Sequence, residues 1–307
     1  MGVGSAEAAA VSAWLAAQWA AAPETGRVGV EGTELAWRGW NLAARDRPGI
    51  VLVHGFRAHA RWWDHIAPAL GHGFRVVAFD LSGMGDSGRR GSYARLQHGR
   101  EVAAIARAQG FDRPTVIAHS YGGVISMMHA RAHPQDFGRL IVIDSMLPTD
   151  ADEPHVIDER PSPMYASREA ALARYALRPP GGWPHPEVLA YVAAHSLRPA
   201  AGGWEWKFDP GLMAPLNADT EWRAGLSGVT TAANFIYGDR SELLTPERLA
   251  QVPRILLRAG APIAIPACHH HVPLEQPLAL TAVLRGLLAD VAPACDRRET
   301  RRLAEVV

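Results

Sequence analysis

The sequence TVIAHSYGGVISMMHARA, residues 115–132, decides the fold of this protein. Its first four residues predict a buried strand, and residues 122–132 predict a helix. Ser120 stands at the turn between them, with Ala118 two positions before it and Gly122 two positions after it. Larger side chains at these flanking positions would clash in so sharp a turn. The spacing therefore predicts a strained turn that exposes the serine hydroxyl, although a turn with a capping serine is the plainer alternative.

The rest of the chain alternates short apolar runs with longer helical segments. Predicted strands are 50–53, 74–79, 115–118, 140–143, 233–237 and 262–265, and predicted helices are 60–70, 93–109, 122–132, 246–259 and 277–288. Residues 28–40 predict an antiparallel pair before them. Helices of this length between strands predict right-handed crossovers and a parallel sheet. The predicted fold class is α/β, with a mostly parallel central sheet flanked by helices.

The alternation stops at residue 146 and resumes near residue 229. The stretch 146–228 is rich in proline and tryptophan and holds short helical segments, which predicts an inserted, mostly helical cap. The remaining units are an N-terminal helical extension (1–26), an α/β core (27–145 and 229–290) and a charge-rich C-terminal tail (291–307).

A serine hydroxyl is a weak nucleophile and needs a base. The candidates are His269, His270 and His271, which follow the last predicted strand. Three consecutive residues rarely aim all their imidazoles at one point, and no cysteine or carboxylate pattern completes a zinc site. We therefore expect no metal here, and the residues alone leave open which histidine is the base.

An acid is also needed to orient the histidine and stabilise its cation. Asp144 follows the predicted strand 140–143, beside the strand that leads to Ser120, and we favour it. Asp239 and Glu242, which follow the strand 233–237, remain the alternatives.

Two backbone N–H groups are expected to stabilise an oxyanion. One belongs to Tyr121, directly after Ser120, and the other to Phe56, in the loop after the strand 50–53. Gly55 lets this loop approach closely, and His54 is expected to hydrogen-bond the loop.

Four ordered motifs resemble the α/β-hydrolase superfamily over about residues 27–290. They are the loop HGF (54–56), the loop DLSGMGDS (80–87), the turn AHSYG (118–122), and ACHH (267–270) followed by Glu275 and Pro277. In this family the catalytic histidine precedes an acidic residue by five positions and a proline by seven, so the resemblance selects His270. Ser241 stands where the usual aspartate would be, which resembles the subset whose acid follows the strand after the nucleophile helix. Asp144 fits that subset.

The resemblance implies a serine hydrolase that cleaves a carboxylic ester or lactone through an acyl-enzyme on Ser120, with no cofactor. Serine at the turn argues against the relatives that use a carboxylate nucleophile, such as epoxide hydrolases. Alternatives are a cofactor-independent lyase, carbon–carbon hydrolase or oxygenase on the same residues, and a ligand-binding pseudo-hydrolase.

Composition limits the partners. Lys and Arg total 31, as do Asp and Glu, so the net charge is zero and gives no electrostatic reason to expect nucleic acid or a membrane. Two cysteines, Cys268 and Cys295, indicate no disulfide framework. No basic segment precedes the alanine-rich N-terminus, so we expect a cytoplasmic protein that acts on a small molecule. The sequence does not predict its oligomeric state.

Overall fold

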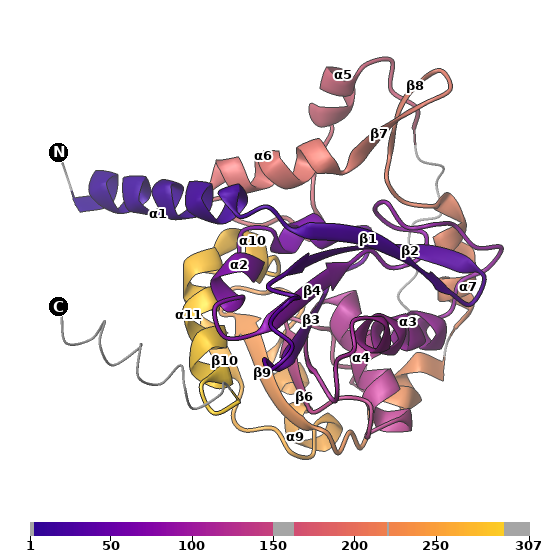
Figure 1. Cartoon of the computed structure of the whole chain (residues 1–307), viewed down its shortest axis with the longest axis vertical. Helices are drawn as coiled ribbons and strands as arrows, with labels where there is room; N and C mark the ends of the chain where they lie inside the picture. Colours follow the sequence, from indigo (N-terminus) through magenta and orange to yellow (C-terminus); the bar gives the residue numbers. More distant parts are fainter. Residues whose placement is uncertain (1–2, 150–162, 220, 292–307) are drawn as a thin grey trace.

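The computed structural model describes residues 3–149, 163–219 and 221–291. Its centre is an eight-stranded sheet (Figure 1). In spatial order the strands are β1 (Glu24–Val30), β2 (Thr33–Trp40), β4 (Arg75–Phe79), β3 (Gly49–Val53), β5 (Thr115–His119), β6 (Arg139–Ile143), β9 (Ala232–Gly238) and β10 (Ile263–Ile265). The pairs β1–β2 and β2–β4 are antiparallel, and every later pair is parallel. The predicted mostly parallel α/β sheet is confirmed.

The central strands are short and apolar because both of their faces are covered. Val51 and Val53 pack into one core cluster, whereas Ile50 and Leu52 pack into the other, as the two-residue period of a strand requires. Helices α3 (Arg95–Ala108) and α4 (Tyr121–Ala132) contribute to the first cluster. Helices α1 (Val3–Ala20), α2 (Ala67–Leu70), α10 (Val272–Glu275) and α11 (Pro277–Leu288) contribute to the second.

Two predicted helices are wrong because each is split. Residues 60–70 form a 3₁₀ helix η1 (Ala60–Trp63) and the separate α2, and residues 246–259 form α8 (Pro246–Leu249) and α9 (Val252–Ile255). Pro253 lacks an N–H group, and its ring would clash with the preceding turn of a continuous helix. The proline therefore explains the break before α9.

The segment predicted as a cap contains a hairpin that the sequence analysis missed. Antiparallel β7 (Leu197–Ala200) and β8 (Gly203–Trp206) accompany α5 (Arg168–Leu172), α6 (Pro186–His195), η2 (Pro210–Leu212), α7 (Met213–Ala218) and η3 (Glu221–Leu226). The chain after the hairpin hydrogen-bonds the glycine-rich loop (residues 80–87). Gly85 N donates to Lys207 O (2.7 Å), and Asp209 N donates to Gly83 O (2.7 Å). Residues 150–162 of the predicted cap lie outside the described residues.

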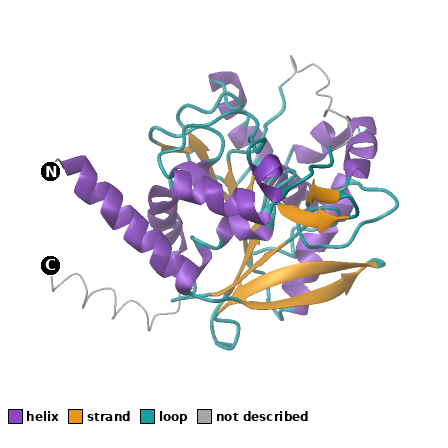
Figure 2. Cartoon of the chain, turned by 90° about the horizontal axis from the view of Figure 1, so that it is seen from above, coloured by secondary structure: helices purple, strands orange, loops and turns teal. Residues whose placement is uncertain are grey.

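The predicted N-terminal extension contains α1, the long helix next to the label N in both views (Figures 1 and 2), and Figure 1 shows that it reaches α6. Val11 and Leu15 are buried, and Ser12 Oγ donates to Glu187 Oε1 of α6 (3.1 Å). The following strand already begins at Glu24. No helix in the described part of the chain is long and apolar enough to cross a membrane. Nearly all of the predicted tail 291–307, including Cys295, lies outside the described residues.

Candidate active site

Ser120 occupies the strained turn between β5 and α4. Its backbone has φ 54° and ψ −122°, a combination that residues other than glycine rarely adopt. Ser120 N donates to Ile143 O of the neighbouring strand (2.9 Å), and the residue is partly exposed. A Cβ atom on Gly122 would lie 2.5 Å from His54 O. The predicted need for a small residue at position 122 therefore has a specific cause, which is the close approach of the loop that follows β3.

The structure brings Ser120, His270 and Asp144 together in one hydrogen-bonded chain. Ser120 Oγ lies 3.0 Å from His270 Nε2, and His270 Nδ1 lies 2.7 Å from Asp144 Oδ1. An ionised carboxylate can only accept, so Nδ1 carries a proton and Nε2 is free to accept from the serine. The three residues follow β5, β10 and β6 respectively, at the carboxyl ends of parallel strands, where open α/β sheets bind ligands.

Asp144 is fully buried and held by two further donors. Its Oδ2 accepts from Gly238 N (2.8 Å), and its Oδ1 accepts from Ser241 Oγ (2.7 Å). Ser241, which stands in place of the family's usual aspartate, makes a hydrogen bond that was not predicted from the sequence. The alternative acids lie elsewhere: Asp239 Oδ1 accepts from Cys268 N (3.1 Å), and the Glu242 side chain is exposed.

The two predicted oxyanion donors lie on neighbouring segments. The rings of Phe56 and Tyr121 meet edge to face with centroids 5.5 Å apart. A Cβ on Gly55 would lie 3.3 Å from Ser120 Cβ, so the loop passes close to the serine. Neither the Phe56 nor the Tyr121 N–H has a hydrogen-bond acceptor among the described residues. Both amides therefore remain available to a ligand.

The other two histidines of the run have separate environments. His269 Nδ1 and the His269 N–H both contact Glu275 Oε2 (2.9 and 3.1 Å). Glu275 is buried and also accepts from Gly182 N and His271 N (3.1 Å each), which ties the predicted cap to the histidine loop. His271 is buried, donates from Nε2 to Pro179 O (2.8 Å) and stacks on Trp183. Of the three consecutive histidines, His270 is the one that hydrogen-bonds Ser120.

Neutral histidines brace the loops around the site. His54 Nδ1 donates to Gly55 O (2.7 Å), and its Nε2 accepts from Leu81 N (3.1 Å), as expected for a residue that hydrogen-bonds the loop. His98 Nε2 donates to Ser82 O (3.2 Å), which leaves Nδ1 to accept from the Tyr121 hydroxyl (2.7 Å). Burial lowers the pKa of both imidazoles from 6.5 to about 4, so both are neutral at pH 7.

Acidification is expected to destabilise the protein through these buried histidines. Burial also lowers the pKa of His65 to about 4. Below pH 6.5 the unfolded chain binds protons that the folded chain does not, so stability is lost as the pH falls from 6.5 towards 4. The free energy of unfolding, measured by urea titration, should be about 1–2 kcal/mol lower at pH 5 than at pH 7 for each such histidine.

Two variants separate this effect from general acid sensitivity. His98→Gln should reduce the pH dependence, whereas replacement of the exposed His72 should not. Asp80 acts in the opposite sense, because burial raises its pKa to about 6 and its contribution is lost as the pH rises through that value. Equal stability at pH 5 and pH 7 would contradict the prediction.

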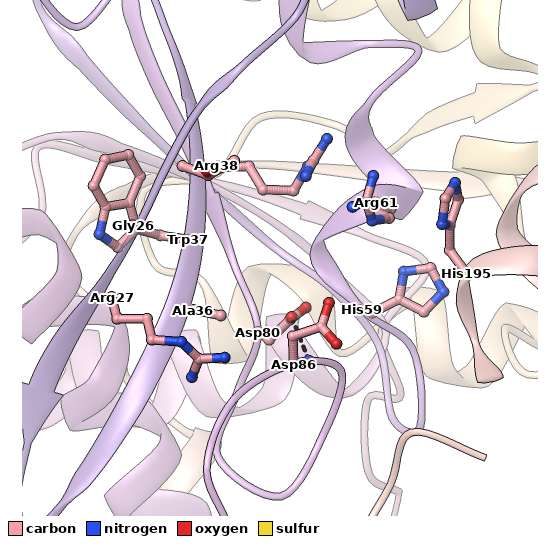
Figure 3. A pocket seen from close by; sticks show the side chains of 11 residues that line it. Gly26, Arg27, Ala36, Trp37, Arg38, His59, Arg61, Asp80, Asp86 and His195 are labelled. Carbon is pink, nitrogen blue, oxygen red and sulfur yellow. Dashed lines mark hydrogen bonds between the residues drawn. The ribbon is translucent and has the colours of Figure 1, made fainter. Parts of the chain in front are cut away.

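A pocket of about 560 Å³ is lined by residues of β1, β2 and α6 and of the segments that follow β3 and β4 (Figure 3). Arg27 and Arg38 of β1 and β2, His195 of α6, and the carboxylates of Asp80 and Asp86 line it. Asp80 accepts from Ala60 N (2.6 Å) and Asp86 N (2.8 Å), so it braces the glycine-rich loop. The hydrogen-bonded chain of serine, histidine and aspartate does not line this pocket, which therefore lies apart from it.

This sheet, with a serine at the strained turn after β5 and a histidine after the last strand, has the architecture of the α/β hydrolases. The model of the Alpha/beta hydrolase family matches residues 50–283, and the chain belongs to this family.

Two relatives from Mycobacterium tuberculosis match most of the chain. Lipase LipV is 27% identical over 248 residues, which cover 78% of this chain and 92% of the relative. Esterase Rv0045c is 25% identical over 254 residues, which cover 78% and 83%. The crystal structure of that esterase has a TM-score of 0.67 at 22% identity, over 92% of this chain and 98% of the other. Epoxide Hydrolase A from Mycobacterium thermoresistibile has a TM-score of 0.66 at 19% identity, over 87% and 98%. The structural likeness therefore shows the fold and does not select a reaction.

Proposed function

We propose that the protein hydrolyses a carboxylic ester or lactone with Ser120 as the nucleophile. The observation that carries the proposal is the continuous hydrogen-bonded chain from Asp144 through His270 to Ser120. The two mycobacterial relatives named as a lipase and an esterase support the same bond type. A serine at the turn offers a hydroxyl rather than a carboxylate, which favours acyl transfer over the chemistry of the epoxide hydrolase neighbour.

In the proposed reaction the Ser120 oxygen attacks the carbonyl carbon while its proton passes to His270 Nε2. Asp144 accepts the hydrogen bond from His270 Nδ1–H and stabilises the imidazolium that forms. The Phe56 and Tyr121 amides donate to the oxyanion of the tetrahedral intermediate. His270 then gives its proton to the leaving alcohol, and a water molecule activated by the same imidazole releases the acid from Ser120.

A panel of short-chain p-nitrophenyl esters and of simple lactones tests the proposal. The purified protein should hydrolyse at least one class with saturation kinetics, and a chelator should not reduce this activity. Absence of turnover on the whole panel, in protein shown to be folded by circular dichroism, would overturn the proposed reaction.

A further inference from the structure

We propose that His119, His270 and His271 together bind one transition-metal ion, with Zn²⁺ as the reference ion, and that this ion switches the enzyme off. The inhibitory consequence rests on the proposed function, because His270 is the base assigned there. The binding itself rests on geometry alone. The three consecutive histidines alone predict no metal site; the third imidazole comes instead from His119 of β5, which lies 151 positions from His270.

The three imidazoles form one buried cluster. One nitrogen from each ring lies within 4.8 Å of the others. Ring centroids are 4.9 Å apart for both His119–His270 and His270–His271, and 6.2 Å apart for His119–His271. A tetrahedral zinc ion with bonds of about 2.0–2.1 Å holds neighbouring nitrogens about 3.4 Å apart. Metal binding therefore requires the nitrogens to move closer together by at most about 1.4 Å.

Each ring already has the second hydrogen bond that a metal-binding histidine needs. His119 Nε2 donates to His270 O (2.9 Å), and His271 Nε2 donates to Pro179 O (2.8 Å), because a carbonyl can only accept. His270 Nδ1 donates to Asp144. A histidine metal ligand characteristically donates its other ring N–H to a carbonyl or carboxylate, which fixes the tautomer.

These bonds leave one lone pair on each ring. Nδ1 of His119 and Nδ1 of His271 are buried and have no hydrogen-bond partner among the described residues. Burying a polar nitrogen without a partner is costly, so both sites favour a ligand that accepts a lone pair. The third lone pair is on His270 Nε2, opposite Ser120.

The electrostatic surroundings and the access route also suit a cation. Asp144 places a buried carboxylate 2.7 Å from His270 and offsets part of the charge of a bound ion. Imidazole nitrogens suit Zn²⁺, Cu²⁺ and Ni²⁺ rather than Mg²⁺ or Ca²⁺. Because a substrate must reach the partly exposed Ser120, an ion can enter by the same route. Occupation of the Nε2 lone pair then removes the base from the reaction.

Isothermal titration of the metal-free protein with Zn²⁺ tests the site without relying on turnover. We expect one ion per chain, and the same stoichiometry in Ser120→Ala, which keeps all three imidazoles. His271→Gln retains a donor for Pro179 O but removes the lone pair, and should weaken binding by at least about tenfold. The matched control is His269→Gln on the same loop, which should leave the affinity unchanged. Visible d–d bands of Co²⁺ in the unmodified protein provide a second readout that needs no variant.

The outcomes separate the two proposals. In the active protein, Zn²⁺ should inhibit hydrolysis with the affinity found by titration, and EDTA should restore it. Binding that His271→Gln does not weaken, or the absence of stoichiometric binding and of tetrahedral Co²⁺ bands, would overturn the metal site even if hydrolysis is found. Stoichiometric binding that depends on His271 in a protein without hydrolytic activity would overturn the proposed function and leave the metal site standing.

Discussion

Replacement of Ser120 by alanine is expected to lower kcat for ester hydrolysis by about 10⁴-fold or more. The hydroxyl is the attacking group in the proposed reaction and lies 3.0 Å from His270 Nε2. KM should change far less than kcat, because the substitution removes an interaction that matters in the transition state. Steady-state kinetics on the best ester of the panel measure both parameters.

Ser126→Ala is a matched control within the same helix. Ser126 is buried in α4, and its hydroxyl has no hydrogen-bond partner among the described residues. The variant should keep kcat and the circular dichroism spectrum of the unmodified protein. If Ser120→Ala retained more than about one tenth of the activity, Ser120 would not be the nucleophile.

Asp144→Asn is expected to lower kcat by about 10⁴-fold, the scale seen when a triad aspartate becomes an amide. The reason is that an amide nitrogen facing His270 Nδ1 would favour the wrong imidazole tautomer. Asp239→Asn and Glu242→Gln should each retain most of the activity, since neither side chain contacts His270. Activity loss that ranked Asp239 or Glu242 above Asp144 would refute the assignment of the acid.

Ser241 offers a sharper form of the same test. Its hydroxyl lies 2.7 Å from Asp144 Oδ1, the oxygen that also contacts His270 Nδ1 at 2.7 Å. We therefore expect a carboxylate at position 241 to reach the same imidazole. The double variant Asp144→Ser/Ser241→Asp should recover part of the activity that Asp144→Ser alone loses. No recovery in a folded double variant would mean that the position of the acid is more restricted than these distances indicate.

Much of the core could be predicted because its determinants are local. Residues 50–53 and 116–118 are continuous apolar runs of the kind typical of a strand covered on both faces, and the strained turn at Ser120 follows from steric limits at two positions. The hairpin β7–β8 could not be predicted in this way. It contains Pro199 and is rich in glycine and tryptophan, so no strand period marks it, and its Trp204 pairs with Tyr165 outside the hairpin.

In the candidate site too, the features set by local sequence could be predicted and the long-range contacts could not. Ser120 and the two amides could be predicted from the short motifs that contain them. His270 was selected by resemblance, from its spacing to Glu275 and Pro277. The Ser241–Asp144 hydrogen bond and the approach of His119 to His271 join residues 97 and 152 positions apart. Such contacts depend on the tertiary fold, and no sequence period records them.

The most direct test of the central claim is covalent labelling of Ser120 with a fluorophosphonate, followed by peptide mapping by mass spectrometry and parallel measurement of hydrolysis. We expect one adduct per chain, located on Ser120, with activity lost in proportion to the labelled fraction. Ester hydrolysis that persists in fully labelled protein, or an adduct on another residue that accompanies the loss of activity, would contradict it.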